Sequence, residues 1–388
     1  MKIARLMTLL FIACPALCGA RSAAAATSYR LALPGYRYQF PRDHASHPAF
    51  NNEWWYYTGH LQSTNKNSRR RRFGYQLTFF RIALKPNLTG RKSKWAVRDV
   101  IFVHFTVTDE NNQKFYVMDR ISRTALGLAG ADSINSIKKN PKLPRIWLGD
   151  WTLRFSGKTG EQQIMRAAGH SNGIRLAIDL QQRALKLPTI HGQNGVSQKA
   201  AGQGRASHYY SFTSLATHGT VQVGDERYTV TGQSWFDHEF GSNQLTKNQV
   251  GWDWFSLQLA DGREIMLYNM RLRNGGIDPY SSGTLVERNG QARHLKLQNF
   301  RVQPLATWRS AQSGATYPAR WRVTLPREGI HLEITPTVAN QELNTKRSVG
   351  VNYWEGSVRI AGTQRGRALS GSGYVELTGY AGAFDRTF

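Results

Sequence analysis

The chain has 388 residues, with 51 Lys and Arg against 25 Asp and Glu and a formal net charge of +26. Its two cysteines, Cys14 and Cys18, lie near the start, which excludes a disulfide framework, a cysteine nucleophile and a cysteine metal site in the rest of the chain. The basic residues are scattered through alternating segments rather than gathered on one helix. Nucleic acid is therefore not favoured as a partner, and an anionic envelope surface is the expected electrostatic one.

The first 26 residues have the order of a secretory signal peptide. Lys2 and Arg5 precede an apolar run at 6–13, and small residues at 23–26 follow it. The run is too short to cross a bilayer, which takes about 20 apolar residues. We therefore expect cleavage near Ala26 and a periplasmic or secreted protein.

Short aromatic segments separated by turn residues predict an almost all-β chain. The stretch 122–144 is expected to be a loop with one short helix at 122–129, and 193–205, rich in Gly, Gln and Ala, a mobile connection. The strands expected before residue 233 are 53–61 and 73–84, joined by a basic loop, then 97–108, 114–120, 151–156, 174–180, 207–215, 220–223 and 227–232.

The second half carries sharper hairpin signals. Asp261-Gly262 and Asn289-Gly290 are dipeptides that tight hairpin turns require, and both separate strand-like runs. Many short antiparallel strands without a long helix predict closed or nearly closed barrels. An aromatic hairpin begins each half, at 54–81 and at 252–271, which predicts two related domains at 27–243 and 244–388. Further strands are expected at 320–325, 330–334, 349–360 and 368–378.

The stretch 234–259 concentrates groups that can transfer protons. Asp237, His238 and Glu239 are consecutive, and tryptophans flank them on both sides. An apolar wall shifts carboxylate and imidazole pKa values, so the three residues are candidates for one proton-transfer site. The alternative is structural, a buried Asp-His-Glu turn that caps strand ends and bonds to backbone. The flanking tryptophans are Trp235, Trp252 and Trp254.

Six motifs follow one another along the chain. They are Arg-Asp-His at 42–44, Glu-Trp-Trp-Tyr-Tyr-Thr-Gly at 53–59, His-Tyr-Tyr-Ser at 208–211, Trp-Phe-Asp-His-Glu-Phe-Gly at 235–241, Trp-Asp-Trp-Phe at 252–255 and Tyr-Trp-Glu-Gly at 353–356. Together they resemble the AttH-like secreted lipocalin-like proteins, a group related to carotenoid 1,2-hydratases and lipocalin-like cyclases and often labelled as secreted hydrolases. The resemblance covers about residues 36 to 380.

The resemblance implies a fold, a partner and a possible activity. The fold is all-β, with two lipocalin-like antiparallel β-barrel domains packed side by side and an apolar pocket at or between them. The partner is an ABC transporter of the lipoprotein-releasing type. If the chain is an enzyme, the implied activity is that of a hydro-lyase acting on a polyene or isoprenoid.

Related hydratases use a His in the equivalent of the Asp-His turn, with a Tyr and an acid on a later strand. His238 and Tyr268 match this pattern, but the strand at 267–271 carries no carboxylate, and Asp253 is the acid that could replace it. The candidate catalytic residues, if the chain is an enzyme, are His238, Asp237, Glu239, Asp253 and Tyr268.

A serine hydrolase and a metalloenzyme are not favoured. Ser46 and Ser207 precede histidines but lack the Gly-x-Ser-x-Gly context, and no two histidines have helical i, i+4 spacing on a helix. No cofactor or metal is expected.

The leading expectation is the binding of an elongated apolar or lipid-like ligand in a barrel pocket. Trp54 and Trp55 would point to opposite faces of their strand. Glu53 and Glu355 could instead form strand-end ion pairs with Arg81 or Arg271 and not touch a ligand. The candidate ligand-binding residues are Glu53, Trp54, Trp55, Tyr57, Tyr209, Trp235, Trp252, Trp254 and Trp354.

Overall fold

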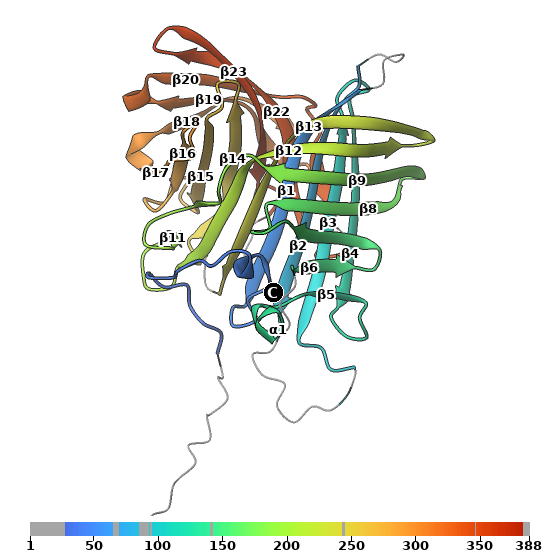
Figure 1. The fold of residues 1–388 in the computed structure, drawn as a ribbon. Helices are drawn as coiled ribbons and strands as arrows, with labels where there is room; N and C mark the ends of the chain where they lie inside the picture. The colour runs from blue at the N-terminus through green and yellow to red at the C-terminus, as the bar shows by residue number, and fades with distance from the viewer. Residues whose placement is uncertain are drawn as a thin grey trace, which may run out of the picture.

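The protein is described by a computed structural model that covers residues 28–64, 70–84, 93, 95–139, 143–242, 245–345 and 347–382. The signal peptide expected at 1–26 lies outside these residues. The regular secondary structure of the described chain is almost entirely antiparallel strands, which are arranged in two sheets (Figure 1). The described helices are α1 (Ile134–Lys139) and three 3-10 turns, η1 (Arg42–His44), η2 (Leu297–Asn299) and η3 (Pro326–Glu328). Within the described part of the chain, no helix has the length and apolar character that crossing a membrane requires.

The first sheet holds every strand up to β13 and curls into a nearly closed barrel. Its terminal strand β4 lies against β5, β6 and β8, although it is paired only with β3. In spatial order the strands are β4 (Lys114–Arg123), β3 (Asp99–Asp109), β2 (Arg72–Ala83), β1 (Asn52–Ser63), β13 (Glu226–Gly241), β12 (Ala206–Val223), β9 (Ile174–Ala184), β8 (Gln162–Ser171), β7 (Trp151–Ser156), β6 (Arg145–Leu148) and β5 (Ala129–Ala131); β10 (Thr189–Ile190) and β11 (Ser197–Gln198) also pair with β12.

The second sheet forms a half-barrel. Its strands, in spatial order, are β17 (Ala292–Lys296), β16 (Ser282–Val286), β15 (Glu264–Leu272), β14 (Gln249–Leu259), β23 (Arg367–Leu377), β22 (Asn352–Gln364), β20 (Ile330–Pro336), β19 (Thr316–Leu325) and β18 (Arg301–Arg309), and β21 (Glu342–Asn344) pairs with β22.

Strand alternation gives each sheet two different faces. On β1, Trp55 and Tyr57 point into the first barrel, where they join its buried apolar core. On β14, Phe255 and Leu257 point into the core of the second sheet. Where the two sheets meet, the other face of each is turned toward the other domain, and aromatic side chains from both form a third buried cluster between them. This cluster contains Tyr56, Tyr209, Trp235, Trp254, Met266, Tyr268, Met270 and Tyr374.

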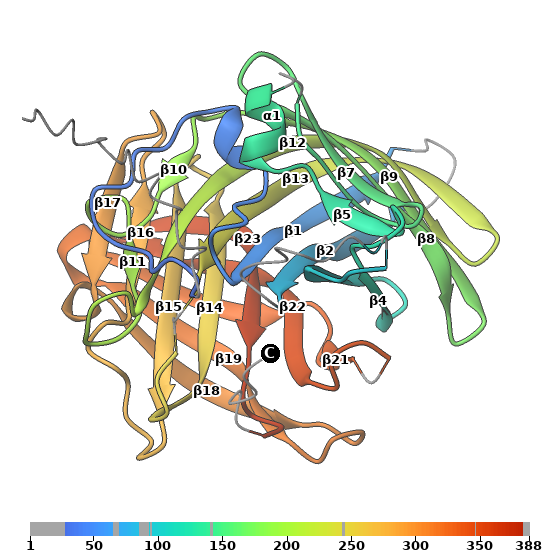
Figure 2. The ribbon, with the colours of Figure 1, turned by 90° about the horizontal axis from the view of Figure 1, so that it is seen from below.

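The two sheets pack side by side, with β1 against β23, β2 against β22 and β12 against β14 (Figure 2). Direct bonds cross the interface, including His104 Nδ1 with the Tyr353 hydroxyl at 2.7 Å and Lys186 Nζ with Glu264 at 2.7 Å. The predicted fold class of two antiparallel β-barrel-like domains is confirmed. The predicted boundary between residues 243 and 244 falls on residues that are not described.

Several expected elements differ from those found. The helix expected at 122–129 is wrong, since β4 continues to Arg123 and turns follow, while the short helix lies at α1. The two strands expected at 207–215 and 220–223 are one strand, β12, whose pairing with β13 shifts between Phe212 and Leu215. The connection at 193–205 contributes β11 to the first sheet.

Candidate functional site

Strand β13 divides the central acidic stretch between two environments. Asp237 and Glu239 point toward the second sheet, whereas His238 points into the first barrel and stacks on Trp55. Consecutive residues of a strand necessarily face opposite sides of the sheet. The expectation of one site containing Asp237, His238 and Glu239 therefore does not match the fold.

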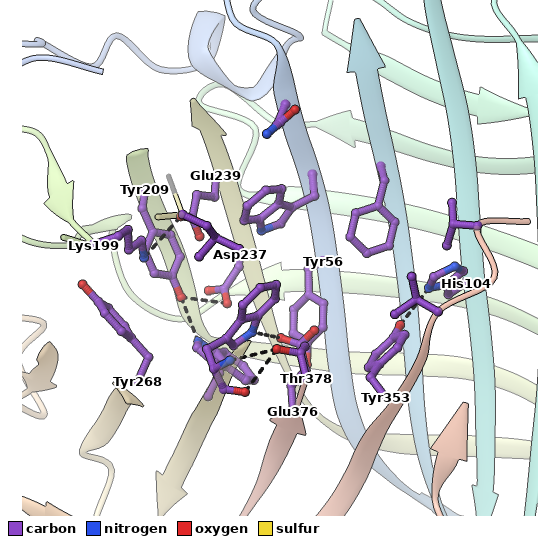
Figure 3. Close-up of a pocket in the computed structure, with 18 of the residues that line it drawn as sticks. Tyr56, His104, Lys199, Tyr209, Asp237, Glu239, Tyr268, Tyr353, Glu376 and Thr378 are labelled. Carbon is purple, nitrogen blue, oxygen red and sulfur yellow. Dashed lines mark hydrogen bonds and ion pairs between the residues drawn. The ribbon is translucent and has the colours of Figure 1, made fainter. Parts of the chain in front are cut away.

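Asp237 and Glu239 line a cavity of about 170 Å³ between the two sheets (Figure 3). Its walls are mainly aromatic and come from the inter-sheet faces of β1, β2, β3, β12, β13, β14, β15, β22 and β23 and the connections beside them. Lys199 and Tyr268 lie at one side of the cavity, and His104 and Tyr353 lie at the other, beyond Tyr56. The aromatic wall is formed by Trp54, Tyr56, Phe80, Phe102, Tyr209, Trp252, Trp254, Tyr268 and Tyr353.

Asp237 accepts hydrogen bonds on both carboxyl oxygens. The Ser211 hydroxyl and Trp235 Nε1, the latter at 2.6 Å, donate to Oδ1. The Tyr209 hydroxyl donates to Oδ2 at 2.9 Å and itself accepts from Trp254 Nε1 at 3.1 Å. Burial raises the pKa of Asp237 to about 7, although the three donated bonds oppose the rise. Asp237 therefore exchanges its proton near neutral pH.

Two further carboxyl groups lie close to Asp237. Trp252 Nε1 donates to Glu376 at 3.0 Å, and burial raises the pKa of Glu376 to about 7. The Tyr56 hydroxyl donates to Glu355 at 2.6 Å, and burial together with the neighbouring Glu376 holds the pKa of Glu355 well above its usual range. All three pKa values are raised because burial is not offset by a positive charge: among the described residues, no cation forms an ion pair with any of the three carboxyl groups.

Lys199 is the cation of this cavity, with 6% of its surface exposed. Its Nζ lies 3.2 Å from Glu239 and 4.0 Å from the centre of the Tyr268 ring. Burial opposes the charge, but Glu239 and Tyr268 outweigh burial and raise the pKa of Lys199. Glu239 also accepts a hydrogen bond from the Ser207 hydroxyl. This side of the cavity therefore contains the ion pair of Lys199 and Glu239, next to the rings of Tyr209 and Tyr268.

His104, at the opposite side, is uncharged. Burial lowers its pKa to about 3, and its Nδ1 is bonded to the Tyr353 hydroxyl. With Phe80 and Phe102 beside it, this part of the cavity offers a ligand an apolar surface.

His238 belongs to a separate network inside the first barrel, centred on Glu53. Glu53 binds Arg81 Nε at 2.9 Å, His47 Nδ1 at 2.7 Å and His238 Nε2 at 2.9 Å. Burial alone would raise the pKa of Glu53, but Arg81 and His47 outweigh it and leave the pKa lowered. Burial lowers the pKa of His238, although Glu53 opposes it. The ion pair between Glu53 and Arg81 that the sequence left open as an alternative is present.

The same network contains the ligand geometry of a possible metal site. One donor atom each from His47, Glu53 and His238 lie within 4.8 Å of one another. All three residues are buried, and the guanidinium of Arg81 bonds directly to Glu53. A second cation would be repelled by that guanidinium, so the arrangement favours a structural network.

A family model for AttH-like proteins matches residues 31–380. The chain belongs to the AttH-like family. The resemblance expected from the six motifs is thereby confirmed. A crystal structure assigned to AttH from Nitrosomonas europaea superposes with a TM-score of 0.76 at 30% identity, covering 90% of this chain and 98% of that one. A comparison with curated protein sequences gives no match.

Two more distant structures share the fold of this AttH-like protein. Kievitone hydratase from Nectria haematococca has a TM-score of 0.64 at 13% identity and covers 92% of this chain and 99% of its own. CghA in complex with Sch210972 has a TM-score of 0.52 at 10% identity, with 92% and 98% covered. At such identities these likenesses concern the two-barrel fold alone.

The residues expected at the AttH-like site fall into three places. The inter-sheet cavity is lined by Trp54, Tyr209, Asp237, Glu239, Trp252, Trp254 and Tyr268, and Trp235 packs beside it. The first barrel holds Glu53, Trp55, Tyr57 and His238, and the second core holds Trp354. Asp253 is buried and bonds to Arg271 at 2.9 Å and to Tyr380 at 3.1 Å, outside the cavity. Whether any of these residues contacts a ligand stays a prediction.

Sequence reasoning missed Lys199, Tyr56 and Glu376. Lys199 stood in a stretch expected to be mobile, and no neighbouring motif marked it. Tyr56 lay within the aromatic motif at 53–59, and the alternation that places Trp54 on the cavity face also places Tyr56 there. Glu376 carried no local signal, because its site is made by packing of one sheet on the other.

Proposed function

We propose that this protein binds a small, elongated, unsaturated apolar molecule in the cavity between its two sheets. The observation that carries the proposal is the cavity itself, about 170 Å³ walled largely by aromatic rings. A water-sized group needs roughly 10–15 Å³ of such space, so the cavity accommodates on the order of a dozen non-hydrogen atoms. That size suits a short isoprenoid, whereas most of a full carotenoid would extend outside.

The polar groups are arranged so that such a molecule binds in one orientation. The side with Lys199 and Tyr268 can bond to an oxygen, while the side with His104 and Tyr353 supplies apolar contact through Phe80 and Phe102, whose rings pack against His104. Pockets of this kind, largely apolar with a few convergent polar groups, are the usual form of small-molecule sites.

Tryptophan fluorescence offers a direct test with geraniol, a ten-carbon isoprenoid alcohol, as the probe. Saturable quenching is expected, and Trp54→Ala should weaken binding about tenfold because one aromatic wall is lost. Trp147→Ala is the matched control, since Trp147 lies on β6, away from the cavity. Absence of saturable binding of both geraniol and the longer farnesol would contradict the proposal.

A second candidate function is acid-catalysed addition of water to a double bond, and the state of Asp237 favours it. Protonated Asp237 would give its proton to an alkene carbon, forming a C–H bond and leaving a carboxylate and a carbocation. Tyr56, Trp252 and Trp254 line the cavity with aromatic rings, and the face of such a ring can stabilise a cation. Water then adds to the cation, and its extra proton returns to the Asp237 carboxylate.

Mass spectrometry distinguishes the two functions. The protein and Asp237→Asn are each extracted with organic solvent after purification from their native envelope, and the small molecules are compared. A carrier should yield the same molecule from both forms. An enzyme should yield, from the variant alone, an accumulated species lighter by one water. A substrate that Asp237→Asn converts as well as the wild type does would rule out Asp237 as the acid.

Membership of the AttH-like family motivates the partner expected from the sequence, an ABC transporter of the lipoprotein-releasing type. We propose that this exported protein exchanges its ligand with such a transporter. Protein purified from cells lacking the transporter should then carry a clearly different ligand load in the same mass-spectrometric measurement. An unchanged load would oppose the partnership while leaving the cavity proposal standing.

A further inference from the structure

A continuous row of side chains leads from the cavity to the end of the first sheet. Directly paired residues on neighbouring strands point to the same face. From the cavity outward, the paired residues are Glu239 on β13, Trp54 on β1, Phe80 on β2, Phe102 on β3 and Ile121 on β4. The first four line the cavity, and Ile121, on the terminal strand of the sheet, is 45% exposed.

Ile121 is part of a larger exposed apolar surface, which we name the apolar rim. It is formed by residues at the ends of β2 and β4, before the start of β3 and before β5 (Figure 1). Backbone bonds bring its segments together, since Leu84 donates to Arg98 at 2.9 Å and Thr124 donates to Asp99 at 3.0 Å. The apolar rim consists of Leu84, Trp95, Ile121, Leu126 and Leu128, whose exposed fractions lie between 45% and 59%.

Exposed basic residues stand within the apolar rim. The guanidinium carbon of Arg123 lies 4.9 Å from the centre of the Trp95 ring, and Arg98 is exposed beside Leu84. A tryptophan and aliphatic side chains interleaved with arginines match the boundary between lipid headgroups and acyl chains. Without the expected signal peptide, 48 of the 51 Lys and Arg and all 25 Asp and Glu remain, and this net charge of +23 adds attraction to an anionic surface.

We propose that the apolar rim, with Arg98 and Arg123, docks on an anionic lipid bilayer. The row from Ile121 through Phe102 and Phe80 then joins the acyl region of the bilayer to the cavity by an apolar path. Docking goes beyond the proposed ligand function, because a bilayer surface can be bound whether or not the cavity is filled. The charge complementarity selects a bilayer rather than an apolar protein partner.

The test is co-sedimentation of the protein, without its expected signal peptide, with vesicles. One set of vesicles contains phosphatidylglycerol and phosphatidylcholine, and the other contains phosphatidylcholine alone. We expect binding to the anionic vesicles that is at least about tenfold weaker for the double variant Trp95→Ser with Leu126→Ser. Arg123→Glu should weaken the same binding and reduce its salt dependence. Leu187→Ser is the matched control, since Leu187 is 81% exposed but lies outside the apolar rim.

The outcomes separate docking from the ligand proposal. The proposal is overturned if the wild-type protein does not bind anionic vesicles, or if it binds both vesicle types equally. A double variant that binds anionic vesicles like wild type also overturns it, because attraction would then come from diffuse charge. Geraniol binding, measured on the same double variant, should be unchanged, which also shows that the variant is folded.

Discussion

Two buried carboxyl groups on neighbouring strands, Asp237 and Glu53, have opposite pKa shifts. Both lose solvation, which raises the pKa of a carboxyl group. For Glu53, the positive charges of Arg81 and His47 more than offset the loss of solvation, so its pKa is lowered. Asp237 receives only neutral donors, so its pKa ends raised to about 7. Glu53 is therefore an ionised carboxylate inside the barrel, whereas Asp237 in the cavity gains or loses its proton near pH 7.

Replacement of Asp237 by Asn should make stability less dependent on pH. Between pH 5 and 8 the wild type must ionise a buried acid whose pKa lies about three units above that of the unfolded chain, a difference of roughly 2–4 kcal/mol. The variant has nothing to ionise there. The free energy of unfolding in urea, measured at pH 5 and pH 8, should thus fall less for Asp237→Asn. Asp150→Asn, at an exposed site, should keep the wild-type difference; an equal fall in both variants would contradict the assignment.

Arg81→Met should be strongly destabilising. Arg81 bonds to both Glu53 and Asp99, at 2.9 Å each, and its removal leaves the buried Glu53 without its arginine, while Asp99 keeps only the more exposed Arg98, at 2.6 Å. Breaking a buried pair in this way costs about 3–5 kcal/mol. Urea unfolding at pH 7 measures the loss.

A matched pair of variants locates the source of that loss. Arg166→Met removes an exposed partner of Asp179 and should change stability by less than about 1 kcal/mol. Adding Glu53→Gln to Arg81→Met should restore part of the stability, since one uncompensated charge disappears. If the double variant is less stable than Arg81→Met, the loss of stability does not come from the uncompensated charge of Glu53.

At the scale of elements, the sequence predicted strands where aromatic and β-branched residues dominate. The aromatic motif at 53–59 became β1, and 151–156 became β7 with the expected bounds. Strand β8 was missed because Gln162–Ser171 contains little of that signal and owes its pairing to β7 and β9.

Only those features of the candidate site that follow from the alternation of side chains along a strand could be predicted from the sequence. The alternation of β13 places Asp237 and His238 on opposite faces of the sheet, so the sequence run Asp-His-Glu does not form one site. Trp54, Trp252 and Trp254 were expected at the ligand site and do line the cavity, because they are on the faces where the sheets meet. Lys199 and Glu376 could not be found, since the register between two packed sheets leaves no local trace in the sequence.

Gly232→Ala tests the pairing of β1 with β13. A Cβ at this position would lie 1.9 Å from the backbone oxygen of His60, so the two strands would have to move apart. Overpacking of this kind costs typically about 1–3 kcal/mol. The midpoint of urea unfolding should drop accordingly, whereas Thr231→Ala, exposed on the same strand, should change it little. Similar midpoints for the two variants would show that the strands adapt without cost.

For the whole molecule, burial between and within two barrels creates two sets of titrating groups with opposite effects. Burial raises the pKa values of Asp237, Glu264 and Glu376 to about 7. Burial lowers the pKa values of His44 and His104 to about 3. Both sets favour folding while they are uncharged: the carboxyl groups lose that contribution as pH rises toward 7, and the histidines lose it as pH falls below about 6.5.

Stability should therefore fall on both sides of the range from about pH 4 to 6.5, within which the opposite slopes of the two sets largely cancel. From about pH 4 to 7 the folded protein holds protons that unfolded carboxyl groups release, so the free energy of unfolding falls as pH rises. Below about pH 6.5 the unfolded histidines bind protons that the folded ones exclude, so it falls as pH drops. The two slopes cancel only where the ranges overlap. Urea unfolding from pH 4 to 9 measures the curve, and a maximum at pH 8 would mean that the carboxyl groups of the cavity are ionised in the folded protein.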